Sequence, residues 1–216
     1  MKDLFGQEIR PKIQSNPAAS LKTAVGKVIT NDGKVAYMGP FLEAFAANRM
    51  LDDLLQTVPW EQDELTIFGR KIITQRKTAW YGDLPYAYTY SHATKVALPW
   101  TPALQTIKEK VELISGESYN SCLLNLYHDG NEGMGWHSDD EDTIARDSAI
   151  ASVSFGAARR FDFRHKKTGE KVQVMLENGS LLVMKGETQR FWQHSLPKSK
   201  RITAPRVNLT FRRMIG

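Results

Sequence analysis

The spacing of hydrophobic residues changes near residue 120. Before that point, two segments repeat apolar residues at the period of an α-helix. The first stops at Pro59; the second begins at Thr101-Pro102, a capping residue followed by a first-turn proline, and ends at Gly116. Both are predicted to be core-facing helices. Their apolar positions are Phe41, Leu42, Phe45, Leu51, Leu54, Leu55 and Val58 in the first, and Leu104, Ile107, Val111 and Ile114 in the second.

From Ser121 onward the apolar period shortens to two, which is typical of half-buried strands. Nearer the N-terminus, residues 27–29 and 35–37 flank Asn31-Asp32-Gly33, a turn sequence that can close a hairpin. Short strands with turn signals between them predict a sandwich or double-sheet barrel in a single α+β domain, with the two helices on one outer face. The candidate strands cover residues 121–127, 149–155, 160–164, 171–176, 180–184, 191–195 and 206–213.

The length and composition of the chain fit one domain with one core. It has 216 residues, of which 41% are hydrophobic and 25% are charged. Residues 1–26 are polar with scattered basic side chains. We expect them to form a flexible basic arm, or a poorly packed extension without a function, ahead of a single domain at residues 27–216.

The single cysteine, Cys122, excludes an internal disulfide and a thiolate zinc cluster, which indicates a reducing compartment. On its strand Cys122 is most simply a small core residue. The N-terminus lacks the apolar segment of a signal peptide, and no stretch approaches the roughly 18 apolar residues of a membrane span. We therefore expect a soluble intracellular protein, cytoplasmic or nuclear, that does not bind membranes.

The net charge of +5 is unevenly distributed. Residues 158–216 hold fourteen basic and four acidic side chains, whereas residues 139–142 form a short acidic run. A basic surface can serve solubility alone, or it can bind a polyanion, most commonly nucleic acid.

Two of the five histidines combine with an aspartate in a pattern suited to a metal ion. His137 and Asp139 are two positions apart, so they point to the same side of an extended segment. His194 lies on a predicted strand. Two histidines and one carboxylate form the ligand set of non-haem Fe(II) oxygenases, which leaves coordination positions for a cosubstrate and O2. A His-x-Asp pair alone is also a common accident of protein surfaces.

Two strands carry a polar face that suits a small anion. The arginines of the last strand are about 20 Å apart at about 3.3 Å per residue, too far to share one carboxylate. They can instead hold the two ends of a dicarboxylate through charge-assisted hydrogen bonds. An ordinary half-buried strand with a solvated basic face is the alternative. The polar positions are Arg206, Asn208, Thr210 and Arg212 on the last strand, and Asn125 and Tyr127 on the first of the C-terminal strands.

The order of these motifs resembles the AlkB family of Fe(II)- and 2-oxoglutarate-dependent dioxygenases. The resemblance covers about residue 25 to the C-terminus and is strongest from Ser121 onward. Three further strings, at residues 152–156, 163–166 and 194–197, look especially like the DNA-repair members. The ordered elements are Asn125-x-Tyr127, His137-x-Asp139, His194, and Arg206 followed by Arg212.

The resemblance implies a double-stranded β-helix, or jelly roll, at about residues 119–216, preceded by a nucleotide-recognition lid at about residues 60–95. It implies that His137, Asp139 and His194 hold Fe(II) as the catalytic centre. With O2, such an enzyme hydroxylates the N-methyl group of 1-methyladenine or 3-methylcytosine in DNA, and the product loses formaldehyde to restore the base. The implied contacts of 2-oxoglutarate are Asn125, Tyr127, Arg206, Asn208, Thr210 and Arg212.

The same resemblance suggests substrate contacts. Asp140 and Glu141 can favour a cationic methylated base, although a solvated turn explains them as well. In the lid, Tyr88 and Tyr90, with Ser91 beside them, are candidates to stack on an extruded base. A cross-strand aromatic pair is the alternative for the tyrosines.

Phe68 aligns with the apolar finger that duplex-acting relatives insert into the base stack, and Arg76 follows as a candidate contact to the nucleic-acid backbone. A buried Phe68 in an ordinary hairpin is the competing explanation.

Other functions remain open from sequence. The same chemistry can act on RNA or on both nucleic acids. A nucleic-acid-binding module with a degenerate metal site is a second alternative, but every ligand position is filled. A zinc hydrolase would leave the two arginines without a role. We expect a monomer with DNA, or possibly RNA, as its partner.

Overall fold

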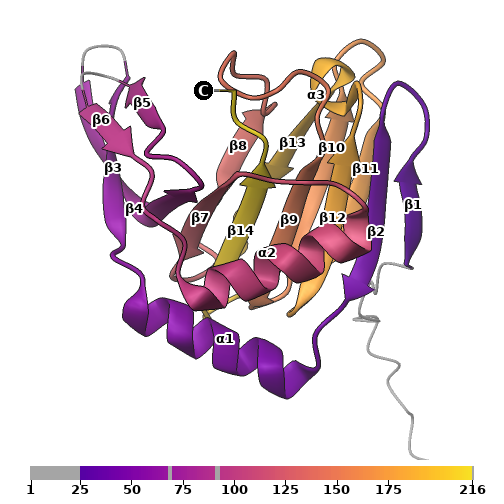
Figure 1. Cartoon of the computed structure of the whole chain (residues 1–216). Helices are drawn as coiled ribbons and strands as arrows, with labels where there is room; N and C mark the ends of the chain where they lie inside the picture. The colour runs from indigo at the N-terminus through magenta and orange to yellow at the C-terminus, as the bar shows by residue number, and fades with distance from the viewer. Residues whose placement is uncertain (1–24, 68–69, 91–92, 216) are drawn as a thin grey trace, which may run out of the picture.

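The computed structural model describes residues 25–67, 70–90 and 93–215. Figure 1 shows two helices lying across one face of a large twisted sheet, with a smaller sheet on its other face. The helices are α1 (Ala44–Thr57), α2 (Pro102–Ser115) and α3 (Thr188–Phe191). The strands are β1 (Gly26–Ile29), β2 (Lys34–Pro40), β3 (Glu61–Ile67), β4 (Arg70–Gly82), β5 (Ala87–Tyr90), β6 (Ala93–Val96), β7 (Ser121–Tyr127), β8 (Met134–His137), β9 (Ile150–Gly156), β10 (Arg159–His165), β11 (Lys171–Leu176), β12 (Ser180–Lys185), β13 (Trp192–Leu196) and β14 (Arg206–Arg212).

The strands pair antiparallel in two facing sheets. In the part of the chain that the structure describes, the large sheet has eight strands in the order β1-β2-β12-β9-β14-β7-β4-β3, and the small sheet has the order β11-β10-β13-β8. The two sheets form the predicted jelly roll, and the helices cover one face as expected, so the α+β fold is confirmed. The hairpins β3–β4 and β5–β6, which cover most of the proposed lid, lie at one end of the large sheet (Figure 1).

Strict alternation along the strands separates two cores. On β14, Val207, Leu209 and Phe211 point toward the helices and pack with Leu54 and Leu104. The second core lies between the sheets and contains Ile29, Tyr37, Phe163, Leu182 and Trp192. Because one face of β14 is used by the first core, its polar face is turned toward the small sheet.

The helix α2 begins and ends where the sequence predicts. The Oγ1 atom of Thr101 accepts a hydrogen bond from the Leu104 amide at 3.2 Å, and Gly116 ends the helix with φ at 68°. Two core assignments were wrong. Phe45 is 74% exposed, because it lies on the side of α1 opposite the buried Leu54. Ile114 shares a face with Ile107 and Val111 but lies in the last turn of α2, where it is 36% exposed.

Local turn chemistry also predicts the first hairpin correctly. Asp32, in the turn between β1 and β2, has φ at 50°. The short strand β8 was not predicted as a strand, because its four residues lack alternation. None of the helices in the described ranges is long and apolar enough to cross a membrane.

Candidate active site

Strand pairing brings the two predicted histidine ligands together. His194 on β13 is the register partner of His137 at the end of β8. Their ring centroids are 4.3 Å apart. The ring of Phe161 stacks on His194 with a centroid distance of 5.3 Å, so the second histidine is held in a buried aromatic layer.

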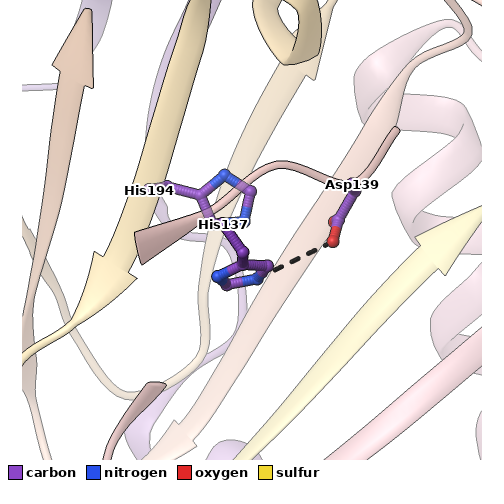
Figure 2. Close-up of side chains that lie close together, drawn as sticks. All are labelled: His137, Asp139 and His194. Atoms are coloured by element: carbon purple, nitrogen blue, oxygen red, sulfur yellow. Dashed lines mark ion pairs between the residues drawn. The ribbon is translucent and has the colours of Figure 1, made fainter. Parts of the chain in front are cut away.

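Asp139 joins the histidines from the segment after β8. Figure 2 shows the three side chains converging, with His137 Nε2 and Asp139 Oδ1 3.8 Å apart. One ligand atom from each residue lies within 4.8 Å of the others. The segment is fixed because the Asp139 amide donates to Gln189 Oε1 at 3.0 Å, and Ser138 Oγ donates to the Trp192 carbonyl at 2.9 Å.

The protonation states of the three residues suit a metal ion. Burial lowers the pKa of His194 to about 4, although the charge of Asp139 opposes this shift. Burial disfavours the ionised form of Asp139, but the charges of Arg212, His194 and His137 outweigh it and hold the pKa of this carboxyl below its usual range. His137 Nδ1 lies 2.9 Å from the Gly135 carbonyl, which only accepts, so Nδ1 carries the proton and Nε2 is free to coordinate.

A cavity of about 70 Å³ lies beside the triad, between the two sheets. It has room for several water-sized groups. Every residue predicted to contact 2-oxoglutarate lines it, as do the three histidine and aspartate residues. Leu124 and Leu126, between the polar residues of β7, belong to the core on the other face of the sheet.

Arg206 is a buried cation without a carboxylate partner among the described residues. Its side chain is 2% exposed. Its Nη2 donates to Ser154 Oγ at 2.9 Å and to Asn208 Oδ1 at 2.8 Å, and its Nε has no hydrogen-bond partner in the described part of the chain. Burial lowers the pKa of Arg206 to about 10, while Tyr127 partly opposes this shift. A buried charge of this kind is costly unless a bound anion compensates it.

Arg212, by contrast, is already paired. Its Nη2 donates to Asp139 Oδ1 at 2.7 Å, from the opposite end of β14 to Arg206. The sequence argument treated both arginines as grips for one dicarboxylate. In the described part of the chain Arg206 has only neutral hydrogen-bond partners, whereas Arg212 orients an acidic residue of the triad.

The donor set therefore fits Fe(II) and a dicarboxylate. Two histidines and one carboxylate point at a common volume, and Arg206, whose Nε is orphaned among the described residues, lines the same cavity. The ionised state of the Asp139 carboxyl favours a divalent cation.

The predicted substrate contacts do not all line the cavity. Asp140 and Glu141 are exposed and do not line the cavity, and Asp140 lies 3.5 Å from Lys166 in an ion pair. Arg76 does line the cavity and donates to Asn125 Oδ1. Tyr88 and Tyr90 lie on β5. Phe68 and Ser91 fall outside the described residues, as does the proposed arm up to residue 24.

Sequence reasoning missed the roles of two serines, Ser152, which lines the cavity, and Ser154, which contacts a residue that lines it. Ser152 Oγ donates to Asn208 Oδ1 at 2.9 Å, and Ser154 holds Arg206. Their alternation on β9 was a usable signal, since it places both on the polar face.

The basic C-terminal region contributes less positive charge to the surface than the sequence predicted. Its residues Arg159, Arg206 and Arg212 are internal or half-buried. Arg159 donates to the carbonyls of Glu132 and Pro197.

Comparison with known proteins decides the family. The 2OG-Fe(II) oxygenase superfamily matches residues 34–212. The chain is 37% identical to the DNA oxidative demethylase ALKBH2 of Mus musculus over 226 aligned positions, covering 100% of this chain and 95% of the relative. It is 42% identical to the human alpha-ketoglutarate-dependent dioxygenase alkB homolog 3 over 195 residues, covering 85% of this chain and 67% of the relative.

The chain belongs to the AlkB family. It is thus an Fe(II)- and 2-oxoglutarate-dependent dioxygenase, whose cofactor is Fe(II) and whose cosubstrates are 2-oxoglutarate and O2. The solved structure of OsALKBH1 matches this AlkB fold with a TM-score of 0.53 at 17% identity, covering 83% of this chain and 96% of that one. That likeness supports the jelly roll alone.

Proposed function

We propose that this dioxygenase removes methyl groups from N-alkylated bases in DNA, with 1-methyladenine and 3-methylcytosine as substrates. The observation that carries the proposal is a complete His-Asp-His triad beside an uncompensated buried arginine, in a chain similar over its full length to a DNA oxidative demethylase. The same chemistry on RNA is the second candidate, and we expect the enzyme to act as a monomer.

The triad residues have distinct roles in this proposal. His137, Asp139 and His194 hold Fe(II), and the Arg212 guanidinium keeps Asp139 ionised and correctly turned. The Gly135 carbonyl fixes the tautomer of His137. When bound, Fe(II), 2-oxoglutarate and O2 supply the oxidising power that the side chains lack.

The cosubstrate is positioned by the polar face of β14 and its neighbours. Arg206, which is buried, would neutralise one carboxylate of 2-oxoglutarate. Asn208 and Thr210 are tied to each other by a 2.8 Å hydrogen bond, which keeps this wall rigid. Asn125 and Tyr127 complete the wall from β7.

The reaction consumes one O2 and one 2-oxoglutarate for each methyl group. One oxygen atom enters succinate as CO2 is lost, and the other enters the N-methyl C–H bond to give N-hydroxymethyl. The hydroxymethyl group of the cationic base then leaves as formaldehyde, its hydroxyl proton is released to solvent, and the neutral unmodified base remains.

Substrate recognition is assigned to the lid and the acidic segment. Tyr88, Tyr90 and Ser91 would contact an extruded base, while Phe68 fills the gap left in the stack. Charge suggests roles for three more residues. Asp140 and Glu141 would attract a cationic lesion from outside the cavity, and Arg76, whose guanidinium lines the cavity, would lie near the entering nucleotide.

Mass spectrometry of treated oligonucleotides tests the proposal. Matched DNA and RNA strands with one 1-methyladenine are incubated with the enzyme, Fe(II), 2-oxoglutarate and ascorbate. We expect loss of the methyl group from DNA. His137→Ala should abolish this loss without abolishing oligonucleotide binding, whereas His128→Ala, outside the cavity, should retain turnover. An intact methyl group in DNA under all conditions would overturn the proposal, and loss from RNA alone would favour the second candidate.

A further inference from the structure

A second cavity, of about 310 Å³, is separate from the active-site cavity and lies next to the C-terminal end of β14. Arg212 lines the active-site cavity, whereas the next residue, Arg213, lines this one. Its walls come from the start of β2, the segment after α2, the segment before β9 and the end of β12. Nothing in the dioxygenase mechanism uses these residues.

The acidic groups of this cavity are already neutralised. Glu117 accepts a hydrogen bond from Lys185 Nζ at 2.8 Å. Asp147 accepts two from Arg190, at 3.1 and 3.2 Å. Lys34 and Arg213 also line the cavity, and neither forms an ion pair within the described part of the chain. The cavity therefore presents two uncompensated positive charges.

A buried hydroxyl group points to the same conclusion. Ser148 Oγ is shielded from solvent and has no hydrogen-bond partner among the described residues, yet Ser148 lines the cavity. Buried polar atoms almost always have a partner, so this hydroxyl is available to a hydrogen-bonding group bound beside it. The turn that presents Ser148 is fixed, because Asp147 is held with φ at 57° by Arg190 and the Ser148 amide donates to the Ala145 carbonyl at 3.1 Å.

We propose that this cavity binds a phosphate group. A phosphate offers several acceptor oxygens, which the Arg213 fork, the Lys34 ammonium and the Ser148 hydroxyl can satisfy separately. An adjoining cavity of about 260 Å³ is lined by Lys27 and shares Lys34 and Lys185, but the rest of its lining is mainly apolar, so the proposed site is the first cavity alone. The phosphate can belong to a nucleic-acid backbone or to a small phosphorylated molecule. The inference does not depend on the demethylase activity.

Amide NMR of the full metal-free chain tests this site. Inorganic phosphate is titrated at constant ionic strength against a sodium chloride control. The amides of Ser148, Lys185 and Gly186 should shift saturably. Arg213→Gln should weaken phosphate binding about tenfold, as loss of a charge-assisted hydrogen bond requires. Ser148→Ala should weaken it by a smaller factor. Lys110→Gln removes the same charge from an exposed position outside the cavity and should change nothing.

An unmodified single-stranded oligonucleotide shows whether the phosphate group belongs to a nucleic-acid backbone or to a small phosphorylated molecule. If it shifts the same amides and displaces phosphate, the ligand is a nucleic-acid backbone. If phosphate binds here and the oligonucleotide does not, the ligand is a small phosphorylated molecule. The site is disproved if phosphate causes no saturable shift at these amides, or if Arg213→Gln and Ser148→Ala both leave its affinity unchanged.

Discussion

The guanidinium of Arg212 donates to the carboxylate of Asp139 at 2.7 Å, joining two residues that are 73 positions apart in sequence. The last strand of the jelly roll thereby controls an acidic ligand carried by a loop. The contact explains how a buried carboxyl stays ionised before metal binds.

Arg212→Gln should weaken metal binding about 10- to 100-fold, because Asp139 loses the partner that orients it. The affinity can be measured by titrating Mn(II), a stand-in for Fe(II), and following its electron paramagnetic resonance signal. Arg213→Gln is the matched control, since Arg213 faces the other cavity and should leave this affinity unchanged. Equal affinities for wild type and Arg212→Gln would contradict the orienting role.

Arg206→Met should abolish the rise in Tm that 2-oxoglutarate causes in the wild-type protein, without unfolding the chain. The substitution removes an uncompensated buried charge and keeps the side chain long and apolar, so the ligand-free protein should be at least as stable as wild type. Thermal melts with and without 2-oxoglutarate measure both effects. A ligand-induced rise in Tm that survives the substitution would rule out Arg206 as the carboxylate partner.

The affinity for 2-oxoglutarate should be constant at neutral pH and should decrease as pH rises through about 10, the pKa of Arg206. The ligand needs the charged guanidinium, which is lost above that pKa. The free energy of unfolding of the ligand-free protein should instead increase as the pH rises and Arg206 loses its proton. Because its folded pKa is below the unfolded value, the unfolded chain binds more protons in that range, and stability rises with pH. Calorimetric titrations at stepped pH, with circular dichroism to verify folding, test the sign.

Cys122→Ser should destabilise the fold by about 1–3 kcal/mol, because it places a hydroxyl in a fully buried apolar site. At about 2–4 °C for each kcal/mol, the loss is visible in a thermal melt. Turnover at low temperature should be retained, since Cys122 faces the helices rather than the cavity. Burial raises the pKa of the thiol well above its usual value, so the folded chain should resist alkylation. Rapid alkylation of the native protein would contradict this placement.

Local patterns explain which elements were predictable. The bounds of β7 and β11 match the predicted strands, because alternation and turn residues mark them in the sequence. In the same way, the capping residues Thr101 and Gly116 mark the start and the end of α2 in the sequence. Phe45 was misassigned because helical periodicity gives a face but not the residue where the helix starts.

Sequence spacing predicted which polar residues of β7 and β14 line the cavity, but not their contacts. Two-residue spacing put Arg206 and Asn208 on one face, and the structure agrees. The pairing of Arg212 with Asp139, and of Ser154 with Arg206, depends on strand order and register, which spacing within one strand does not contain. Sequence alone also left two explanations open for Asp140 and Glu141, and the structure places both residues in the exposed segment outside the cavity.

The stoichiometry of the coupled reaction tests the central claim most directly. Succinate, formaldehyde and the remaining methylated base are measured together after incubation with a 1-methyladenine oligodeoxynucleotide. We predict one succinate and one formaldehyde for each methyl group lost, all dependent on His137. Succinate formation that does not increase with the methylated oligonucleotide would contradict the proposal that this enzyme acts on alkylated DNA bases.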